Sequence, residues 1–244
     1  MQVISLCSQK GGSGKTTLTG HLAVQAALQG HGPVALIDCD PQGSLAAWWN
    51  SREAAQPAFL ETTLATLGAD LQRLREQDFR YVFIDTPPAV SMPILRVMEQ
   101  SDLVVIPTRP SPHDLRAVRA TLDLAERTGK PLIFVVNGAA ARARITSDAA
   151  VALSQHGTVA PSFICHRIAL ASSMIDGRTV MEIDPEHRAS GEIVALWSYL
   201  EDRLVRLANR VAFHRQRPTA RSFGRRSDDN GLSAPPALAE EAVA

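Results

Sequence analysis

The stretch QKGGSGKTT at residues 9–17 carries the residue types that bind phosphate groups. Its glycines are Gly11, Gly12 and Gly14. Glycines let the backbone turn tightly, so that successive N–H groups can point at phosphate oxygens. Lys15 supplies a compact positive charge for the β- and γ-phosphates, and the hydroxyl of Thr16 suits a Mg²⁺ ion. The stretch therefore predicts a loop that binds the phosphates of a nucleotide.

The entrance of this loop is unusual. A phosphate loop of the pattern GxxxxGK[ST] opens with a glycine, but position 9 is Gln9 and a second lysine, Lys10, follows it. The chain has 25 basic residues, of which only Lys10, Lys15 and Lys130 are lysines. An arginine fork is bulkier than an ammonium group, so lysines retained in the loop favour contact with phosphates.

Three aspartates follow predicted strands and could complete a metal site. Asp38 and Asp40 end the stretch LIDCD, and Asp85 ends VFID. The carboxyl ends of parallel strands meet at one edge of a sheet, where α/β proteins bind ligands. Capping of the following helix is the alternative for any one of them, but three aspartates at one edge favour a site. Asp102 and Asp114 lack this placement and are interpreted as helix-start residues.

Five apolar runs predict strands buried on both faces, because Val, Ile, Leu and Phe continue without polar alternation. These runs lie at residues 3–8, 34–40, 81–86, 103–108 and 132–137. Helical patterns lie at about 15–29, 61–77, 91–99, 112–128, 147–156 and 190–213. This alternation predicts an α/β fold, a doubly wound and mostly parallel sheet with helices on both faces. The loop would then open the first helix, whose N-terminus attracts anions.

We expect residues 1–215 to form a single domain. Residues 216–244 are rich in Arg, Ser, Pro, Ala and Gly without periodicity, which predicts a disordered tail. The three cysteines are widely separated, as is usual for buried thiols in a reducing compartment. The sequence shows neither an export leader nor a membrane-spanning run, so we expect a cytoplasmic protein.

The ordered set KGGSGKTT, DCDPQG and FIDTPP resembles the ParA/MinD family of deviant-Walker P-loop ATPases. The resemblance extends over residues 1–210, with further matches at VVN (135–137) and RTVMEIDP (178–185). It implies a Mg²⁺-dependent ATPase that sandwiches ATP in a homodimer. The family's loop reads KGGxGK[ST], and its extra lysine reaches across the dimer to the partner's nucleotide. Lys10 would be that lysine; an ordinary surface charge is the alternative.

The resemblance also implies the catalytic and metal-binding residues. Asp40 would orient the attacking water, while Lys10 and Lys15 would stabilise charge on the phosphates. We expect Asp40 to position the water and not to remove its proton, because an ordinary aspartate is a weak base at neutral pH. The residues implied to hold the Mg²⁺ shell are Thr16, Asp38 and Asp85.

Contacts to the nucleotide follow from the resemblance in the same way. The loop residues implied to bind it are Gly11, Gly12, Ser13, Gly14, Lys15, Thr16 and Thr17. Asn137 and Pro185 would border the adenine ring. An asparagine at a strand end is also a common turn residue, which is the alternative for Asn137.

The net charge of zero conceals a basic stretch near the end of the chain. Residues 203–226 hold eight arginines and no acid, whereas residues 227–244 hold four acids and no base. Clustered arginines bind DNA phosphates without sequence preference and in a salt-dependent way. The predicted DNA contacts are Arg188, Arg215, Arg217, Arg221, Arg225 and Arg226. The alternative is a solvated helix end followed by a basic linker.

ParA-type relatives bind the nucleoid as ATP dimers and release it after hydrolysis. The resemblance therefore implies a nucleoid-associated protein that partitions or positions a cargo: a plasmid, a chromosome or a large protein complex. It also implies an adaptor or ATPase-stimulating protein as a partner.

Two other functions remain open. MinD-like relatives bind membranes through a short amphipathic helix, and residues 200–217 are amphipathic and basic. However, their apolar residues continue the pattern of residues 193–200, which we expect to dock on the sheet, so we favour DNA. Amide-forming synthases of the cobyrinic acid diamide type share the loop but need a glutamine-handling domain, for which 244 residues leave no room.

Overall fold

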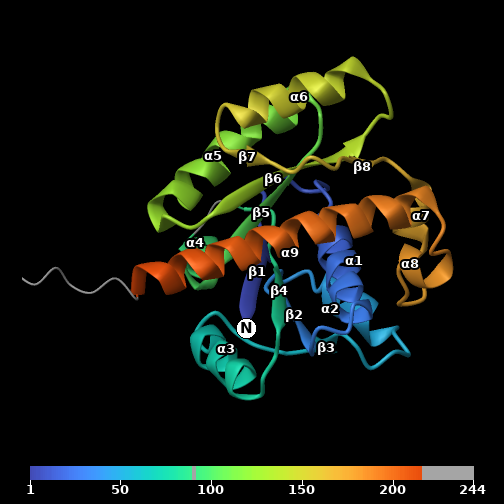
Figure 1. Cartoon of the computed structure of the whole chain (residues 1–244). Helices are drawn as coiled ribbons and strands as arrows, with labels where there is room; N and C mark the ends of the chain where they lie inside the picture. The colour runs from blue at the N-terminus through green and yellow to red at the C-terminus, as the bar shows by residue number, and fades with distance from the viewer. Residues whose placement is uncertain (90–91, 216–244) are drawn as a thin grey trace, which may run out of the picture.

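The computed structural model describes residues 1–89 and 92–215. Its centre is a sheet in which every strand pair is parallel, in the order β3-β2-β4-β1-β5-β6-β7, with β8 also beside β6. The strands are β1 (Gln2–Leu6), β2 (Val34–Asp38), β3 (Ala58–Phe59), β4 (Tyr81–Asp85), β5 (Leu103–Thr108), β6 (Leu132–Ala139), β7 (Thr158–Val159) and β8 (Ile164–Cys165). The predicted parallel α/β architecture is confirmed (Figure 1).

Helices cover both faces of the sheet (Figure 1). One face carries α1 (Lys15–Leu28), α2 (Ser44–Asn50), α7 (Ile168–Ser172), α8 (Val180–Ile183) and α9 (Arg188–Arg215). The other carries α3 (Leu67–Glu76), α4 (Met92–Gln100), α5 (Pro112–Thr128) and α6 (Arg144–Ser154). The strands are therefore buried on both sides, which is why they are continuously apolar.

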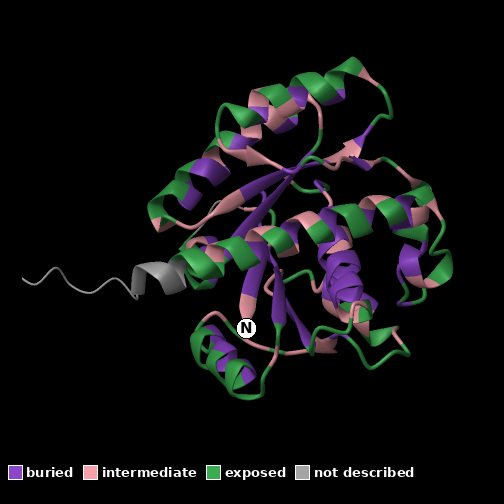
Figure 2. Cartoon of the chain, viewed as in Figure 1, coloured by how far each residue is buried: buried purple, intermediate pink, exposed green. Residues whose placement is uncertain are grey.

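Helix α9 lies across the face of the sheet that also carries α1 (Figure 1). Most of its large apolar residues up to Leu204 are buried, namely Ile193, Leu196, Trp197, Leu200 and Leu204, whereas Val194 is exposed. The Trp197 ring meets Tyr81 edge-on, with 4.9 Å between ring centroids, and lies 5.6 Å from Phe83. Figure 2 shows the strands and most of α1 as buried, whereas the outer sides of α5, α6 and α9 are exposed. The apolar side of α9 thus belongs to the core up to Leu204, as the sequence predicts.

Several elements differ from the sequence prediction. Helix α3 begins at Leu67 rather than near residue 61, because the hydroxyls of Thr63 and Thr66 bond to nearby backbone and compete with helix formation. Helix α6 begins and ends two to three residues earlier than predicted, at Arg144–Ser154. The short elements α2, α7, α8, β3, β7 and β8 were not predicted, since segments of two to seven residues show too little periodicity.

The interpretation of Asp102 as a helix-start residue is wrong. Asp102 directly precedes strand β5, and its carboxylate accepts a hydrogen bond of 2.8 Å from the Val3 N–H. It therefore joins the start of β5 to β1. Asp114 does lie in the first turn of α5, as predicted.

The predicted tail, residues 216–244, lies outside the described residues. Among the residues that the structure does describe, none of the helices combines the length and the apolar character that crossing a bilayer requires.

Candidate nucleotide site

Three strands end side by side at the carboxyl edge of the sheet. In the register of the sheet, Leu6 at the end of β1 pairs with Asp85 at the end of β4, and Asp85 pairs with Asp38 at the end of β2. The loop of residues 7–14 leaves β1 at this edge and leads into α1. The fold thus brings the two predicted metal-binding aspartates beside the phosphate loop.

The loop has a backbone that requires glycine at defined positions. Gly12 and Gly14 have φ angles of 69° and 93°, in the left-handed region. A Cβ atom on Gly14 would lie 2.1 Å from Nδ2 of Asn137, which donates a 2.6 Å hydrogen bond to the Ser13 carbonyl. Asn137 therefore holds the loop from strand β6, and a side chain at position 14 would displace it.

The glycine missing from position 9 is explained by the same backbone. Among the described residues, the non-glycine residues with positive φ are Asp78 and Arg142. Gln9 is not one of them, so its position does not need glycine. Its N–H donates to the hydroxyl of Thr121 in α5 at 3.2 Å, which fixes the entrance of the loop.

A hollow lies on the inner side of the loop. It is lined by Gly11, Gly12, Gly14, Lys15, Thr16, Thr17, Asp40, Gln42, Ser44 and Pro88. Lys15 is buried, and its ammonium donates to the Lys10 carbonyl at 3.5 Å. Burial lowers the pKa of Lys15, and the negative charges of Asp85 and Asp40 partly oppose this effect. A cation with little solvation of its own is suited to bind phosphate oxygens.

Two oxygen donors suitable for Mg²⁺ meet beside this hollow. The Thr16 hydroxyl donates to Oδ2 of Asp85 at 2.5 Å. Burial raises the pKa of Asp85 to about 7, with a further contribution from Asp38, while Thr16 and Lys15 act in the opposite direction. Mg²⁺ prefers hard oxygen ligands and is usually held by one or two carboxylates, substrate phosphates and water. Thr16 and Asp85 are therefore suitable ligands for Mg²⁺, and the phosphates of a nucleotide would supply further ligands to the same ion.

Asp38 and Asp40 have different surroundings. The Asp38 carboxylate accepts hydrogen bonds from the N–H groups of Asp40 (2.9 Å), Leu45 (3.0 Å) and Ala46 (3.1 Å). It therefore caps α2, which is the alternative raised by the sequence, and its place in the Mg²⁺ shell stays a prediction. Asp40 accepts a 3.0 Å bond from the Gln42 N–H and lines the hollow, where a carboxylate can orient a water molecule.

The outer side of the loop contacts α5 and the turn before it. The ammonium of Lys10 lies 3.4 Å from Oδ2 of Asp114. Arg109 follows strand β5, and its Nη2 lies 3.3 Å from the position that a Cβ on Gly12 would take. Sequence reasoning missed the contributions of Arg109, Asp114 and Thr121 to the loop. These contacts join residues about 100 positions apart, so no local sequence motif predicts them.

Other predicted residues lie away from the hollow. Pro185 is exposed in the turn between α8 and α9, and Arg188 is exposed at the first position of α9. Arg215 is the last residue of α9. The remaining predicted DNA contacts, Arg217, Arg221, Arg225 and Arg226, lie outside the described residues. The adenine contacts and DNA contacts stay predictions.

Comparison with known protein families shows which family has this phosphate loop and sheet. Residues 4–180 match the model of the CobQ/CobB/MinD/ParA nucleotide binding domain. The chain belongs to this family. Over 199 residues it is 29% identical to maintenance of carboxysome distribution protein A of Halothiobacillus neapolitanus. This alignment covers 78% of this chain and 91% of that protein. The match to the family model confirms the predicted family. The ParA/MinD family consists of nucleotide-binding ATPases.

Other members of the family match shorter parts. Maintenance of carboxysome distribution protein A of Gloeobacter kilaueensis is 40% identical over 126 residues, which is 51% of this chain and 56% of that protein. Protein ParA of Rhizobium radiobacter is 32% identical over 126 residues, with the same shares. The chain thus spans about half the length of these two relatives.

Solved structures of the family share the fold. McdA of Cyanothece without nucleotide superposes with a TM-score of 0.68 at 18% identity, over 82% of this chain and 99% of that chain. MinD in the MinC:MinD cell division complex of Aquifex aeolicus gives a TM-score of 0.70 at 17% identity, over 83% and 96%. At these identities the likeness shows the fold alone.

Proposed function

We propose that this chain is a ParA-type ATPase whose ATP-bound homodimer binds DNA without sequence preference and positions a cargo on the nucleoid. One observation carries the proposal: the hollow beside the loop brings Lys15, Thr16 and Asp40 together, with Asp85 bonded to Thr16. These residues supply a phosphate-binding cation, metal ligands and a carboxylate for water. The family relationship to partitioning and positioning ATPases supports the same function.

Each residue of the hollow has a distinct part in the proposed reaction. The backbone N–H groups of residues 11–16 bind the phosphates of ATP, and Lys15 binds the terminal ones. Thr16 and Asp85 would hold Mg²⁺, and that ion would neutralise charge on the phosphates. Asp40 orients water for in-line attack on the terminal phosphate. Phosphoryl transfer depends mainly on such positioning and electrostatic stabilisation.

Replacing Asp40 with alanine should separate binding from turnover. Asp40 lines the hollow and its carboxylate accepts a hydrogen bond from the Gln42 N–H, outside the loop of residues 7–14, so the variant should bind ATP with unchanged affinity. We expect hydrolysis to fall by about tenfold or more, because water loses its orienting carboxylate. Phosphate release and fluorescent-nucleotide binding would be measured together. Unchanged turnover with normal binding would remove Asp40 from this role.

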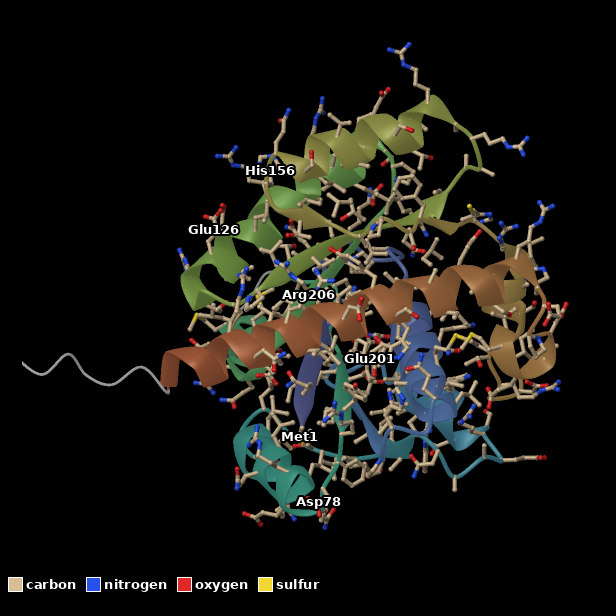
Figure 3. All side chains as sticks on the ribbon, in the orientation of Figure 1. Met1, Asp78, Glu126, His156, Glu201 and Arg206 are labelled. Atoms are coloured by element: carbon tan, nitrogen blue, oxygen red, sulfur yellow. The ribbon has the colours of Figure 1, made fainter. Side chains whose placement is uncertain are left out.

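The DNA-binding surface that we propose begins on the C-terminal half of α9. Arg203, Arg206 and Arg210 surround a shallow concavity with Leu207 and Asn209. Nε of Arg203 is buried and has no hydrogen-bond partner among the described residues. Arg206, labelled in Figure 3, makes only a loose contact of 3.9 Å with Asp202. The exposed side chains of Arg206 and Arg210 are available for phosphates, and they lead into the Arg-rich stretch beyond residue 215.

Arg188 lies at the far end of the same helix. Arg188 and Arg210 lie 22 positions apart, which separates them by roughly 33 Å along the helix axis. The two ends would therefore contact different parts of a DNA duplex, and the surface around Arg210 is the main proposed contact.

Retention on random duplex DNA tests the proposed function. We expect binding with Mg·ATP but not with Mg·ADP, and a steep loss of affinity as salt rises. In the variant R206A/R210A, the affinity for DNA should fall less steeply with salt. The magnitude of the slope of log affinity against log salt should decrease by about 0.9 for each DNA phosphate that the protein no longer binds. The control R116A/R119A removes the same charge from exposed arginines of α5. Equal effects of the two variants would contradict a surface on α9.

The same experiment addresses the membrane alternative. Most large apolar residues of α9 up to Leu204 are buried and only Val194 among them is exposed, so this part of the helix presents one valine, not an apolar side, to lipid. If DNA is not retained in either nucleotide state, binding to vesicles of anionic lipid becomes the next measurement. Vesicle binding without DNA binding would replace the proposed function with a MinD-like one.

A further inference from the structure

Lys10 contacts a carboxylate of its own chain. Its ammonium lies 3.4 Å from Oδ2 of Asp114, in the first turn of α5. The Lys10 side chain is 42% exposed, whereas that of Asp114 is only 9% exposed. A partly exposed cation is thus paired with a nearly buried anion.

Asp114 is held firmly at this position. Ser111 caps α5: its hydroxyl accepts a 3.1 Å hydrogen bond from the Asp114 N–H and also donates to the Asp114 carboxylate. The carboxylate is therefore fixed by its neighbour in the same turn. A carboxylate so constrained loses little entropy when it pairs with a flexible lysine.

The contact holds Lys10 outside its own nucleotide hollow. Lys10 is not among the residues that line the hollow, and only its carbonyl turns toward Lys15. If Lys10 acts across a dimer, its ammonium must leave Asp114 to reach the partner's phosphates. We propose that Asp114 is a positioning residue that retains Lys10 within the free protomer and releases it when the ATP dimer forms.

The ion pair between Lys10 and Asp114 contributes a moderate interaction energy, which suits a reversible contact. Exposed ion pairs change an equilibrium by roughly two- to fivefold. A symmetric dimer breaks the contact in both protomers, so the effect on the dimerisation constant is about the square, roughly four- to 25-fold. Asp114 thus opposes dimerisation until bound ATP offers Lys10 a more highly charged partner. This consequence rests on the proposed function, whereas the contact itself does not.

The contact can be tested in the nucleotide-free protein by acylation of lysines followed by mass spectrometry. The chain has three lysines: Lys10, Lys15 and Lys130. Lys15 is buried, and Lys130 serves as the internal reference. We expect D114N to raise acylation of Lys10 relative to Lys130 by about two- to fivefold, while the control D123N, an exposed position on α5, leaves the ratio unchanged. Raising salt should have the same effect on the unmodified protein without any variant. An unchanged ratio in both arms overturns the contact.

Dimerisation then tests the positioning role. With a non-hydrolysable ATP analogue and Mg²⁺, sedimentation should show a dimer dissociation constant that is about four- to 25-fold lower in D114N than in the unmodified protein and D123N. An equal or weaker dimer in D114N overturns the proposal, because Asp114 would then support the dimer. If no variant dimerises while Lys10 acylation responds as expected, the proposed ATP dimer fails and the intramolecular contact stands.

Discussion

Replacing Gly14 with alanine should lower nucleotide affinity by roughly 100-fold while the protein stays folded. The φ angle of 93° strains any residue with a Cβ, and the new methyl group would lie 2.1 Å from Nδ2 of Asn137. Relief of this clash breaks the bond from Asn137 to the Ser13 carbonyl. The loop would relax to another conformation, so the loss appears in binding rather than in stability. Titration with a fluorescent nucleotide measures it.

A matched control separates the local clash from general glycine effects. Gly129 also has a left-handed backbone, with φ of 61°, but no atom lies within 4 Å of a Cβ built there. Gly129→Ala should cost about 1 kcal/mol of stability, because a Cβ is disfavoured in the left-handed region, and should leave nucleotide affinity unchanged. Adding Asn137→Ala to Gly14→Ala should recover part of the affinity, because the clash is removed although the backbone strain remains. Normal affinity in Gly14→Ala alone would show that the loop binds nucleotide in another conformation.

Acidification should destabilise the protein through His21. This residue is buried between α1 and the segment of α7 and α8. Its Nδ1 donates to the Thr17 carbonyl at 2.8 Å, so Nε2 is the acceptor for Ser173 and for the Val180 N–H, each at 3.3 Å. Protonation would set a new N–H against the Val180 N–H. Burial accordingly lowers the pKa of His21 to about 4, opposed by the Thr17 carbonyl and Glu182.

The sign of the effect follows from the two pKa values. The unfolded chain binds a proton near pH 6.5, whereas the folded protein binds it only near pH 4. The stability from neutral His21 is therefore complete above pH 6.5 and is lost as the pH falls toward 4. Between pH 7.5 and pH 5 the expected loss is about 2 kcal/mol. Urea unfolding at each pH measures it.

Two variants identify His21 as the source of this loss. His21→Gln keeps a neutral polar side chain and should flatten the decline in unfolding free energy by about 2 kcal/mol over that range. His156→Gln changes an exposed histidine just after α6 and should leave the decline unchanged (Figure 3). A decline of equal size in His21→Gln would assign the pH dependence to carboxylates instead.

The sequence predicts the sheet and the loop well because their signals are local. Strands β2 and β4 are apolar up to a final aspartate, β1 is apolar apart from Gln2 and Ser5, and each strand ends at a residue that the sheet places beside the loop. The loop glycines reflect backbone angles that only glycine adopts without strain. The predicted neighbours Asp38 and Asp85 follow from strand order, because parallel strands that end together bring their last residues together.

Long-range contacts explain what the sequence does not predict. The link between Lys10 and Asp114 spans 104 positions and depends on how β1 and α5 meet. Helix α8 is four residues long and is held by tertiary contacts, including the pair of Arg52 with Glu182 at 2.6 Å. Asp38 is a different case, because a strand-end aspartate serves equally for a metal or a helix cap. Only the positions of Leu45 and Ala46 reveal the cap.

The position of the nucleotide site at the ends of strands has an evolutionary consequence. Strand β4 contributes to it only its last residue, Asp85, and the rest comes from the short stretches that follow β1, β2 and β4. Selection on the chemistry therefore acts on a few short segments, and the exposed sides of α5 and α6 contribute no residue to the lining of the hollow. A lineage with this architecture can acquire a new partner on those helices without altering how it handles nucleotide.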